Sequence, residues 1–460
     1  MTSDLISRRT ALSKIAKAAI GVGTIVVVGG GVAGYYATQQ AAPTQQATTT
    51  VMTSATSAPQ EVDIDIAHIT YPYFQDALKT AVPELQAKHP ELTIKATDSV
   101  QDYSAYRQYL ITRMAAGDAP DLMLTDDIWM GEFTQTGFLE PLPDAWATSQ
   151  GPVPDILPNY KEGTTFNGKL YGIWWDTDTR LFPYLKKYIS TPPVTWDDTI
   201  ALQKQLKAQG KPPIAFYAAY GWDDTVNSAM YMNIPVEKLT APGWGFFDVS
   251  SDGTTWTPIF NQDPGVKAFQ YLLDLKNAGG AAILDKPEEV DAAFLNGTYS
   301  AELAGGTWIY SEAVGSGWTA DKYQSELGYV VQPIPKGGHT GSYGGGFVLT
   351  IPAGSKHKDL MEELITYVVD PDLEAKLGAQ YGALFTRQSV LQKLIATNAF
   401  PFADVVAQQL QFTIPRPMIP QWDRVHRYWI DALQATLLGQ KQAKEALDDA
   451  AAKVSILLGD

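Results

Sequence analysis

Residues 114–127 constrain the fold most, because they join a helix to a short buried strand that ends in polar side chains. Apolar residues before this stretch recur three or four apart, which predicts an amphipathic helix, and Gly117 suits the left-handed conformation just past its end. Residues 122–124 are typical of a buried strand, and Asp126 and Asp127 follow it. Open α/β sheets bind ligands at such strand ends, so both carboxylates are candidate ligand-binding residues. A helix N-cap is the competing role.

Short strands and helices alternate through the neighbouring sequence. Residues 63–67 alternate in polarity and predict a strand, residues 74–88 predict a helix, and residues 92–96 predict a second strand. This alternation indicates βαβ units and a largely parallel sheet. Because a chain of 460 residues is too long for one ordinary domain, we expect two lobes.

Further motifs accompany residues 114–127 in a fixed order. They are Gly168 to Ile173, Pro193 to Asp198, Gly305 to Trp308, Gly344 to Phe347, Pro415 to Trp422 and Gly439 to Leu447. Together they resemble the extracellular solute-binding proteins of ABC importers (family 1), the family that includes maltose-binding protein. Each motif alone is weak, but their shared order over roughly residues 62–458 is specific. The resemblance implies an α/β, two-lobed periplasmic-binding-protein-like fold, in which each lobe is a mostly parallel sheet flanked by helices and a hinge joins the lobes.

The resemblance and the local composition divide the chain into six segments. We expect residues 1–38 to be a twin-arginine-like export signal or membrane anchor, and residues 39–60 to be a disordered Thr/Ser/Ala/Gln stalk. The first part of lobe 1 spans residues 61–174, and the first part of lobe 2 spans residues 175–333. The hinge return with the second part of lobe 1 spans residues 334–386. The C-terminal helices of lobe 2 span residues 387–460.

The N-terminal segment predicts an exported protein. Arg8 and Arg9 resemble a twin-arginine signal, and the uncharged apolar run over residues 18–38 is long enough to span a bilayer. No small-x-small cleavage site follows it, which favours retention as a membrane anchor over atypical cleavage. We therefore expect an extracytoplasmic protein that is tethered to the outer face of the cell membrane.

Composition excludes several classes of function. The chain has 34 Lys and Arg against 50 Asp and Glu, for a net charge of −16, and this argues against nucleic-acid binding, which needs a basic footprint. It contains no cysteine, which excludes disulfides, zinc–thiolate sites and cysteine nucleophiles. Its five histidines lie far apart without metal-ligand spacing. We expect neither a cofactor nor a metal site.

Tryptophan and tyrosine occur beside acidic residues at several predicted loops. Aromatic rings cover the CH-rich faces of sugars and carboxylates accept two hydroxyl hydrogen bonds, so the pattern favours a carbohydrate ligand in a cleft between the lobes. The candidate ligand-binding residues are Tyr73, Asp126, Asp127, Trp174, Trp175, Asp176, Trp222, Trp308, Tyr343 and Trp422. Core packing competes with ligand contact for Tyr73 and Trp422, and a hinge hydrogen bond competes for Asp176. The resemblance implies that Trp308 stacks on sugar.

The resemblance implies a binding protein without catalytic residues. Its lobes would close on a sugar or oligosaccharide and deliver it to ABC permease subunits in the membrane, and we expect a monomer. Two alternatives stay open: a secreted carbohydrate-active hydrolase that uses two cleft carboxylates, and the same binder fold with a peptide or anion as ligand. Against an enzyme, the sequence contains no G-x-S-x-G elbow, no H-E-x-x-H motif and no P-loop.

Overall fold

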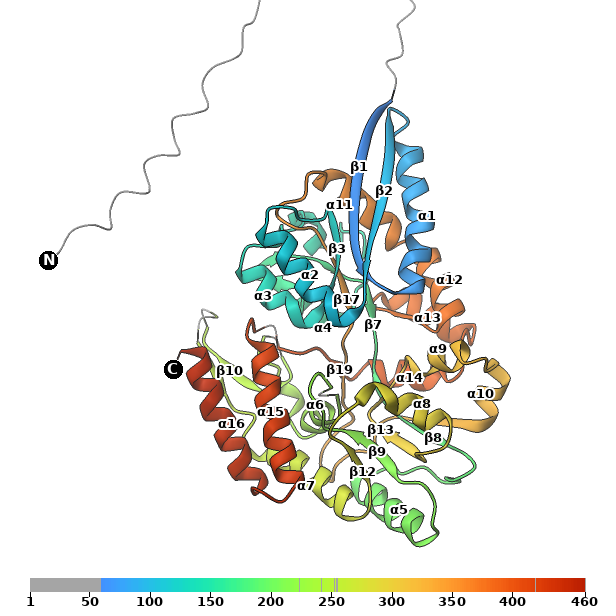
Figure 1. Cartoon of the computed structure of the whole chain (residues 1–460), viewed down its shortest axis with the longest axis vertical. Coiled ribbons are helices and arrows are strands. Elements are labelled where there is room, and N and C mark those ends of the chain that lie inside the picture. The colour runs from blue at the N-terminus through green and yellow to red at the C-terminus, as the bar shows by residue number, and fades with distance from the viewer. Residues whose placement is uncertain are drawn as a thin grey trace, which may run out of the picture. The chain divides into compact units, whose positions relative to one another are not determined.

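The computed structural model describes residues 59–222, 224–240, 242–251, 253, 255–417 and 419–459. The expected export signal, residues 1–38, lies outside this part, as does the expected stalk up to residue 58. Within the described ranges, no helix combines the length and the apolar character needed to cross a bilayer. The described chain forms two main sheets (Figure 1). Most of its buried apolar side chains fall into two large clusters.

The first sheet has the strand order β2-β1-β3-β17-β6. Its strands are β1 (Gln60–Ile69), β2 (Leu92–Gln101), β3 (Leu122–Asp126), β6 (Ile173–Trp174) and β17 (Phe347–Thr350). β1 runs parallel to β2 and β3, whereas β17 lies between β3 and β6 and runs antiparallel to both. All five residues of β3 are buried, which is typical of a strand covered on both faces.

Helices cover the first sheet. They are α1 (Pro72–Lys88), α2 (Tyr103–Ala115), α11 (Lys358–Val368), α12 (Pro371–Tyr381) and α13 (Gln388–Ala396). α1 begins at Pro72, whose fixed φ and missing N–H suit the first helical turn, and it packs on α11 and α12. α13 also packs on α12, because its apolar side chains Val390 and Leu394 are buried in the same cluster as those of α12. This differs from the expectation that all helices after residue 387 cover lobe 2.

The second sheet has the order β12-β9-β13-β8-β14, with β15 also paired to β8. Its strands are β8 (Arg180–Leu185), β9 (Ile214–Tyr217), β12 (Ala281–Ile283), β13 (Ala301–Leu303), β14 (Gly305–Gly306) and β15 (Leu327–Val330). β9 is parallel to β12 and β13, but every pair through β8 is antiparallel. β8 follows β6 of the first sheet through β7, with no helix between them. Parallel neighbours would need a crossover connection, whereas the strands paired with β8 run antiparallel to it.

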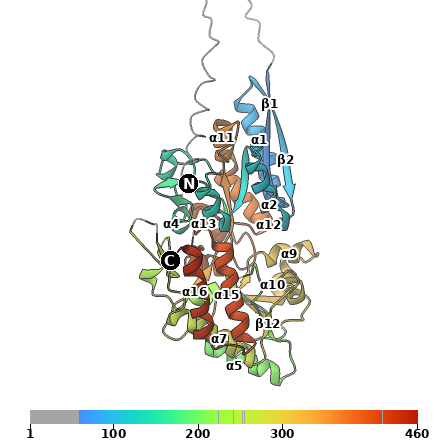
Figure 2. The ribbon, with the colours of Figure 1, turned by 60° about the vertical axis from the view of Figure 1, so that its left-hand side comes forward.

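The second sheet has its own helices. They are α5 (Trp196–Ala208), α7 (Asp263–Asn277), α15 (Trp422–Leu437) and α16 (Ala443–Leu458). α5 begins with a capping box, in which the Thr195 side chain accepts from the N–H of Asp198 and the Asp198 side chain accepts from the N–H of Thr195. α15 and α16 lie side by side and both pack on α7, as the two views show (Figure 1, Figure 2).

The chain passes between the two sheets three times. The first passage runs from β6 through β7 (Asp176–Thr177) to β8, and the second runs from β15 through β16 (Ser342–Tyr343) to β17. The third contains β19 (Thr413–Ile414), which pairs in parallel with β16. The second passage includes the glycine-rich residues 337–346, where the sequence predicted a hinge.

The remaining elements are short connections or small additions to the sheets. The helices among them are α3 (Met130–Gln135), α4 (Pro158–Glu162), α6 (Asp224–Tyr231), α8 (Val290–Leu295), α9 (Ile309–Gly315), α10 (Ala320–Glu326) and α14 (Ala403–Leu410). The strands are β4 (Thr165–Phe166), β5 (Lys169–Leu170), β10 (Phe247–Val249), β11 (Trp256–Pro258) and β18 (Leu384–Phe385). The 3-10 turns are η1 (Asp127–Trp129), η2 (Asp144–Ala147), η3 (Val236–Lys238) and η4 (Pro287–Glu289).

Candidate functional site

A cavity of about 570 Å³ is lined by residues of both sheets and of the passages between them. The loops after β1 and β3 contribute Tyr71 and Asp127, and the second sheet's loops contribute Trp222 and Trp308. Asp176 comes from the first passage. The cavity therefore lies where the carboxyl ends of β1 and β3 point, which is where ligands bind in open α/β sheets.

Seven of the ten candidate ligand-binding residues line this cavity. They are Tyr73, Asp126, Asp127, Asp176, Trp222, Trp308 and Tyr343. Asp126 also fills the competing role, because its side chain accepts the N–H of Ile128 at 3.1 Å and caps η1. The structure thus brings together residues that are far apart in the sequence.

The prediction that Trp174, Trp175 and Trp422 line the cleft is wrong, because each is only 1% exposed and is packed into a core. The Trp174 ring meets Tyr160 edge to face at 4.9 Å. Trp175 packs between other aromatic rings, at 5.3 Å from Phe385. Trp422 packs against other residues of the second cluster. Their large apolar surfaces are buried in the protein interior and stabilise the fold there.

Two tryptophans form an aromatic corner of the cavity. The centroids of the Trp222 and Trp308 rings lie 6.0 Å apart, with the ring planes at 69°. Trp222 stacks on Tyr217, at 5.0 Å and 26°. Behind Trp308, a Cβ on Gly306 would lie about 2 Å from the indole ring. Only glycine therefore allows Trp308 to lie this close to the β14 backbone.

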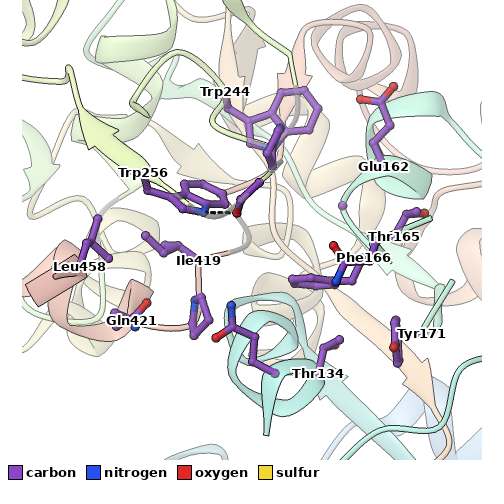
Figure 3. A pocket seen from close by; sticks show the side chains of 16 residues that line it. Thr134, Glu162, Thr165, Phe166, Tyr171, Trp244, Trp256, Ile419, Gln421 and Leu458 are labelled. Carbon is purple, nitrogen blue, oxygen red and sulfur yellow. Dashed lines mark hydrogen bonds between the residues drawn. The ribbon is translucent and has the colours of Figure 1, made fainter. Parts of the chain in front are cut away.

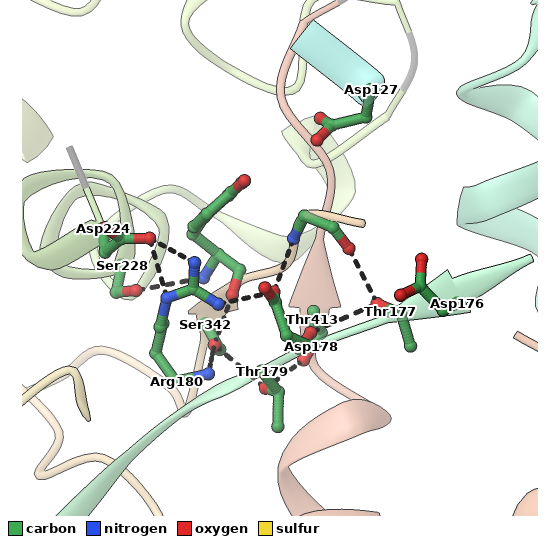
Figure 4. Close-up of polar contacts among 12 residues, drawn as sticks. Asp127, Asp176, Thr177, Asp178, Thr179, Arg180, Asp224, Ser228, Ser342 and Thr413 are labelled. Atoms are coloured by element: carbon green, nitrogen blue, oxygen red, sulfur yellow. Dashed lines mark hydrogen bonds and ion pairs between the residues drawn. The ribbon is translucent and has the colours of Figure 1, made fainter. Parts of the chain in front are cut away.

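A buried ion-pair network lies beside this corner (Figure 4). Arg180, at the start of β8, is only 3% exposed. Its Nε donates to Asp224 Oδ1 at 2.7 Å, and its Nη1 donates to Asp178 Oδ1 at 2.5 Å. The same Asp178 oxygen accepts the N–H of Gly345 at 2.8 Å. The buried guanidinium is therefore matched by two carboxylates, as a buried charge requires.

Hydroxyl groups connect the three passages next to Arg180 and Tyr343, which line the cavity. Thr179 Oγ1 lies 3.0 Å from Ser342 Oγ and 2.7 Å from Thr413 Oγ1 (Figure 4). Ser342 Oγ also accepts the N–H of Arg180 at 2.7 Å. One residue from each passage thus contributes to a single buried hydrogen-bond cluster.

A second arginine contacts the cavity from the third passage. The Arg416 guanidinium carbon lies 4.0 Å from the centre of the Tyr343 ring, and its Nη1 lies 3.5 Å from Asp127 Oδ1. Burial raises the pKa of Asp127 well above its usual range, while Arg416 acts in the opposite direction. Tyr343 has Arg180 within 4.6 Å of its ring as well, so both guanidinium groups lie over the same aromatic ring.

Asp176 joins the first passage to the first sheet. Its carboxylate accepts a hydrogen bond from the Tyr73 hydroxyl, and its Oδ1 accepts the N–H of Phe347 at 2.6 Å. Burial raises the pKa of Asp176 to about 7, and the hydrogen bonds from Tyr73 and Phe347 oppose the rise. Asp176 therefore both lines the cavity and holds β17 against the passage, so the expected hinge hydrogen bond is present.

The sequence reasoning missed five charged side chains that line the cavity, namely Asp178, Arg180, Asp224, Glu312 and Arg416. Asp178 and Arg180 lie two and four residues after the candidate Asp176, and Arg416 lies within the Pro415 to Trp422 motif. Their positions in these two stretches could have identified all three as candidates. Burial raises the pKa of Glu312 to about 7. With Asp126, Asp127 and Asp176, the lining holds six carboxyl groups and two guanidinium groups.

A second cavity, of about 880 Å³, contains none of the ten candidates. Its aromatic residues are Phe166, Tyr171, Trp244 and Trp256 (Figure 3). It has one charged side chain, Glu162. Because it lacks the several charged groups that converge in the first cavity, it is the weaker candidate for a ligand site. Within the described ranges, no cluster of three or more His, Cys, Asp or Glu residues has the arrangement of a metal site.

Comparison with known proteins agrees with this architecture. The receptor GacH of Streptomyces glaucescens GLA.O superimposes with a TM-score of 0.69 at 19% identity, over 87% of this chain and 99% of that one. The sugar-binding protein MalE of Xanthomonas citri gives 0.70 at 21% identity, over 86% and 97%. Maltose-bound MalE3 of T. maritima gives 0.69 at 22% identity, over 86% and 99%. These similarities confirm the two-lobed α/β fold.

Sequence comparison identifies the family. A protein of Brucella abortus (strain 2308), named only as a binding protein, is 24% identical over 402 residues, which cover 85% of this chain and 90% of that one. The family model for bacterial extracellular solute-binding proteins matches residues 71–375. That family consists of binding proteins, not enzymes, and its members act outside the cytoplasm. The chain belongs to the bacterial extracellular solute-binding proteins.

Proposed function

We propose that this protein captures a sugar or oligosaccharide in the 570 Å³ cavity and delivers it to the membrane permease of an ABC importer. The observation that carries the proposal is the meeting of the Trp222 and Trp308 rings with six carboxyl groups in one cavity. The rings offer apolar faces, and the carboxylates offer strong hydrogen-bond acceptors for hydroxyl groups. Solved structures with the same fold contain maltose, maltotriose and acarbose, according to their descriptions.

The two sheets and their helices act as lobes in this proposal. A ligand that contacts Asp127 on one side and Trp308 on the other gains all its contacts only when the lobes are close together, so it stabilises the closed population. In this proposal the lobes take the boundaries expected from the sequence, residues 61–174, 175–333 and 334–386. Of the last expected segment, residues 387–460, only the helices after α13 are assigned to lobe 2. The passages between the lobes act as the hinge.

The N-terminal segment has a role in the same proposal. Its twin-arginine pattern directs export, and its apolar run tethers the binding module to the outer face of the cell membrane. Tethering raises the effective concentration of the loaded protein at the permease. A monomer is part of the same proposal.

A thermal-shift screen tests the sugar proposal. A chain that begins at residue 59 would be heated with mono- and oligosaccharides, and with amino acids, short peptides and phosphate as controls. A ligand that binds only the folded state raises the melting temperature by mass action. We expect a shift with one class of sugar and no loss of that sugar over hours. A shift only with a peptide or an anion would refute the sugar proposal, and breakdown of the sugar would instead indicate a hydrolase.

A further inference from the structure

We propose that Asp291 is a positioning residue of the sugar site, because its buried carboxyl group bonds Trp308 directly and reaches Trp222 through Tyr217. The inference rests on the proposed function, since it assigns Asp291 a part in setting ligand affinity. Asp291 lies on α8, is 3% exposed and does not line the cavity. It would therefore act only through the side chains it contacts.

Each carboxylate oxygen of Asp291 accepts one hydrogen bond from an aromatic side chain. Trp308 Nε1 donates to Oδ2 at 2.6 Å, and the Tyr217 hydroxyl donates to Oδ1 at 3.0 Å. An indole has a single N–H donor, so this bond fixes how the Trp308 ring is turned. Hydrogen bonds to an ionised carboxylate are stronger than bonds between neutral groups, which suits a group that must hold two rings in place.

Tyr217 extends the effect of Asp291 to the second tryptophan. Tyr217 ends β9, is 1% exposed and stacks with Trp222 at 5.0 Å and 26°. Trp222 and Trp308 then meet nearly perpendicular to each other, at 69°. Asp291 thus contacts one ring of the corner directly and the other through Tyr217. A shift of this carboxylate would change the angle between the two surfaces that a sugar meets.

Glu302 supports Asp291 from β13. It is fully buried. Burial and the neighbouring Asp291 raise the pKa of Glu302 well above its usual range. Burial also raises the pKa of Asp291, and hydrogen bonds with Trp308, Glu302 and Tyr217 oppose that rise. Glu302 is therefore a third neighbour of the Asp291 carboxyl group, beside Trp308 and Tyr217.

The test compares Asp291→Ala with Asp291→Asn in the full chain. Alanine leaves the Trp308 N–H and the Tyr217 hydroxyl without their acceptor, whereas asparagine keeps one acceptor oxygen in the same place. With the sugar that shifts the wild-type melting temperature, calorimetry is expected to give a dissociation constant at least about tenfold higher for Asp291→Ala, and partial rescue for Asp291→Asn. The near-ultraviolet circular dichroism of the coupled Trp222 and Trp308 rings is expected to change most in Asp291→Ala and less in Asp291→Asn.

Tyr217→Phe keeps the test decisive if Asp291→Ala does not fold. It removes only the hydroxyl that reaches Asp291, so we expect an altered circular-dichroism signal and a severalfold weaker affinity. Melting temperatures that fall while the dissociation constant and the aromatic signal stay at wild-type values would overturn the proposal. If the wild type binds no sugar, the proposed function fails, but an altered aromatic signal in Asp291→Ala would still show that Asp291 positions the rings.

Discussion

The guanidinium carbon of Arg180 lies 4.5 Å from the centre of the Trp308 ring. The same group forms the buried ion pairs with Asp178 and Asp224, so the first passage between the sheets is physically linked to the aromatic corner. Ligand contact at Trp308 and the geometry of the passage are therefore coupled through one side chain. This coupling makes Arg180 a point where a substitution changes both stability and binding.

Arg180→Met removes the cation that pairs with the buried carboxylate of Asp224 and with the partly exposed carboxylate of Asp178. Removal of one partner of a buried ion pair typically costs about 3–5 kcal/mol, and we expect a loss of this size in the free energy of unfolding by urea. Lys79→Met is the matched control, because Lys79 pairs with Asp76 on the surface, with 74% of the Lys79 side chain exposed. The control is expected to change stability by less than about 1 kcal/mol. Equal effects of the two variants would contradict the buried network.

Trp308→Ala removes one wall of the aromatic corner and leaves the sheets intact. We expect the dissociation constant for the bound sugar to rise at least about tenfold, which corresponds to about 1.4 kcal/mol. Trp318→Ala is the control, since Trp318 lies outside the cavity and is partly exposed. Isothermal titration calorimetry distinguishes the two. Unchanged affinity in Trp308→Ala would show that Trp308 has only a structural role.

Trp422→Ala tests the reassignment of this residue to the core. A buried tryptophan replaced by alanine leaves a large void, and the expected cost is about 3–5 kcal/mol of unfolding free energy. Trp422→Phe keeps much of the ring volume and is expected to cost less. Protein that remains folded in either variant should bind sugar with wild-type affinity, because Trp422 does not line the cavity. A selective loss of affinity would return Trp422 to the ligand site.

The buried carboxyl of Asp176 predicts a pH effect on stability. Its pKa in the folded protein is about 7, raised by burial from the model-peptide value of 3.8, so the folded state binds the proton more tightly than the unfolded state. This contribution to stability is complete below pH 4 and is lost as the pH rises to about 7. It amounts to at most roughly 4 kcal/mol. Asp176→Asn should weaken this pH dependence, measured as unfolding free energy from pH 4 to 8, and an unchanged slope would refute it.

The charge of the cavity predicts discrimination against acidic ligands. Six carboxyl groups and two guanidinium groups line it, and both guanidinium groups already have carboxylate partners. Above about pH 7, where Asp176 is ionised, a sugar acid should therefore bind at least about tenfold more weakly than the corresponding neutral sugar, because like charges repel. Competition calorimetry at low and high salt measures this difference. Tighter binding of the acid would show that the guanidinium groups govern the site.

The sequence predicted most of what local patterns determine. The strand at β3 and the aspartates at its end follow from neighbouring residues. The Arg180–Asp224 pair could not be predicted, because its members are 44 positions apart and meet only in the folded chain. Trp174 and Trp175 were misplaced for a related reason. A tryptophan beside an acidic residue has the same local pattern in a core as in a cleft, and only the packing around it decides which.

The position of β17 has a consequence for biosynthesis. β17 lies between β3 and β6, and its first residue is Phe347. Until Phe347 has been synthesised, the edge of β3 that pairs with β17 stays open, and β6 has no neighbouring strand. Such unpaired edges invite association with other chains, and pairing across so long a stretch of sequence is slow. Lobe 1 is thus completed late in translation. Cells that make much of this protein should depend on chaperones until β17 has been synthesised.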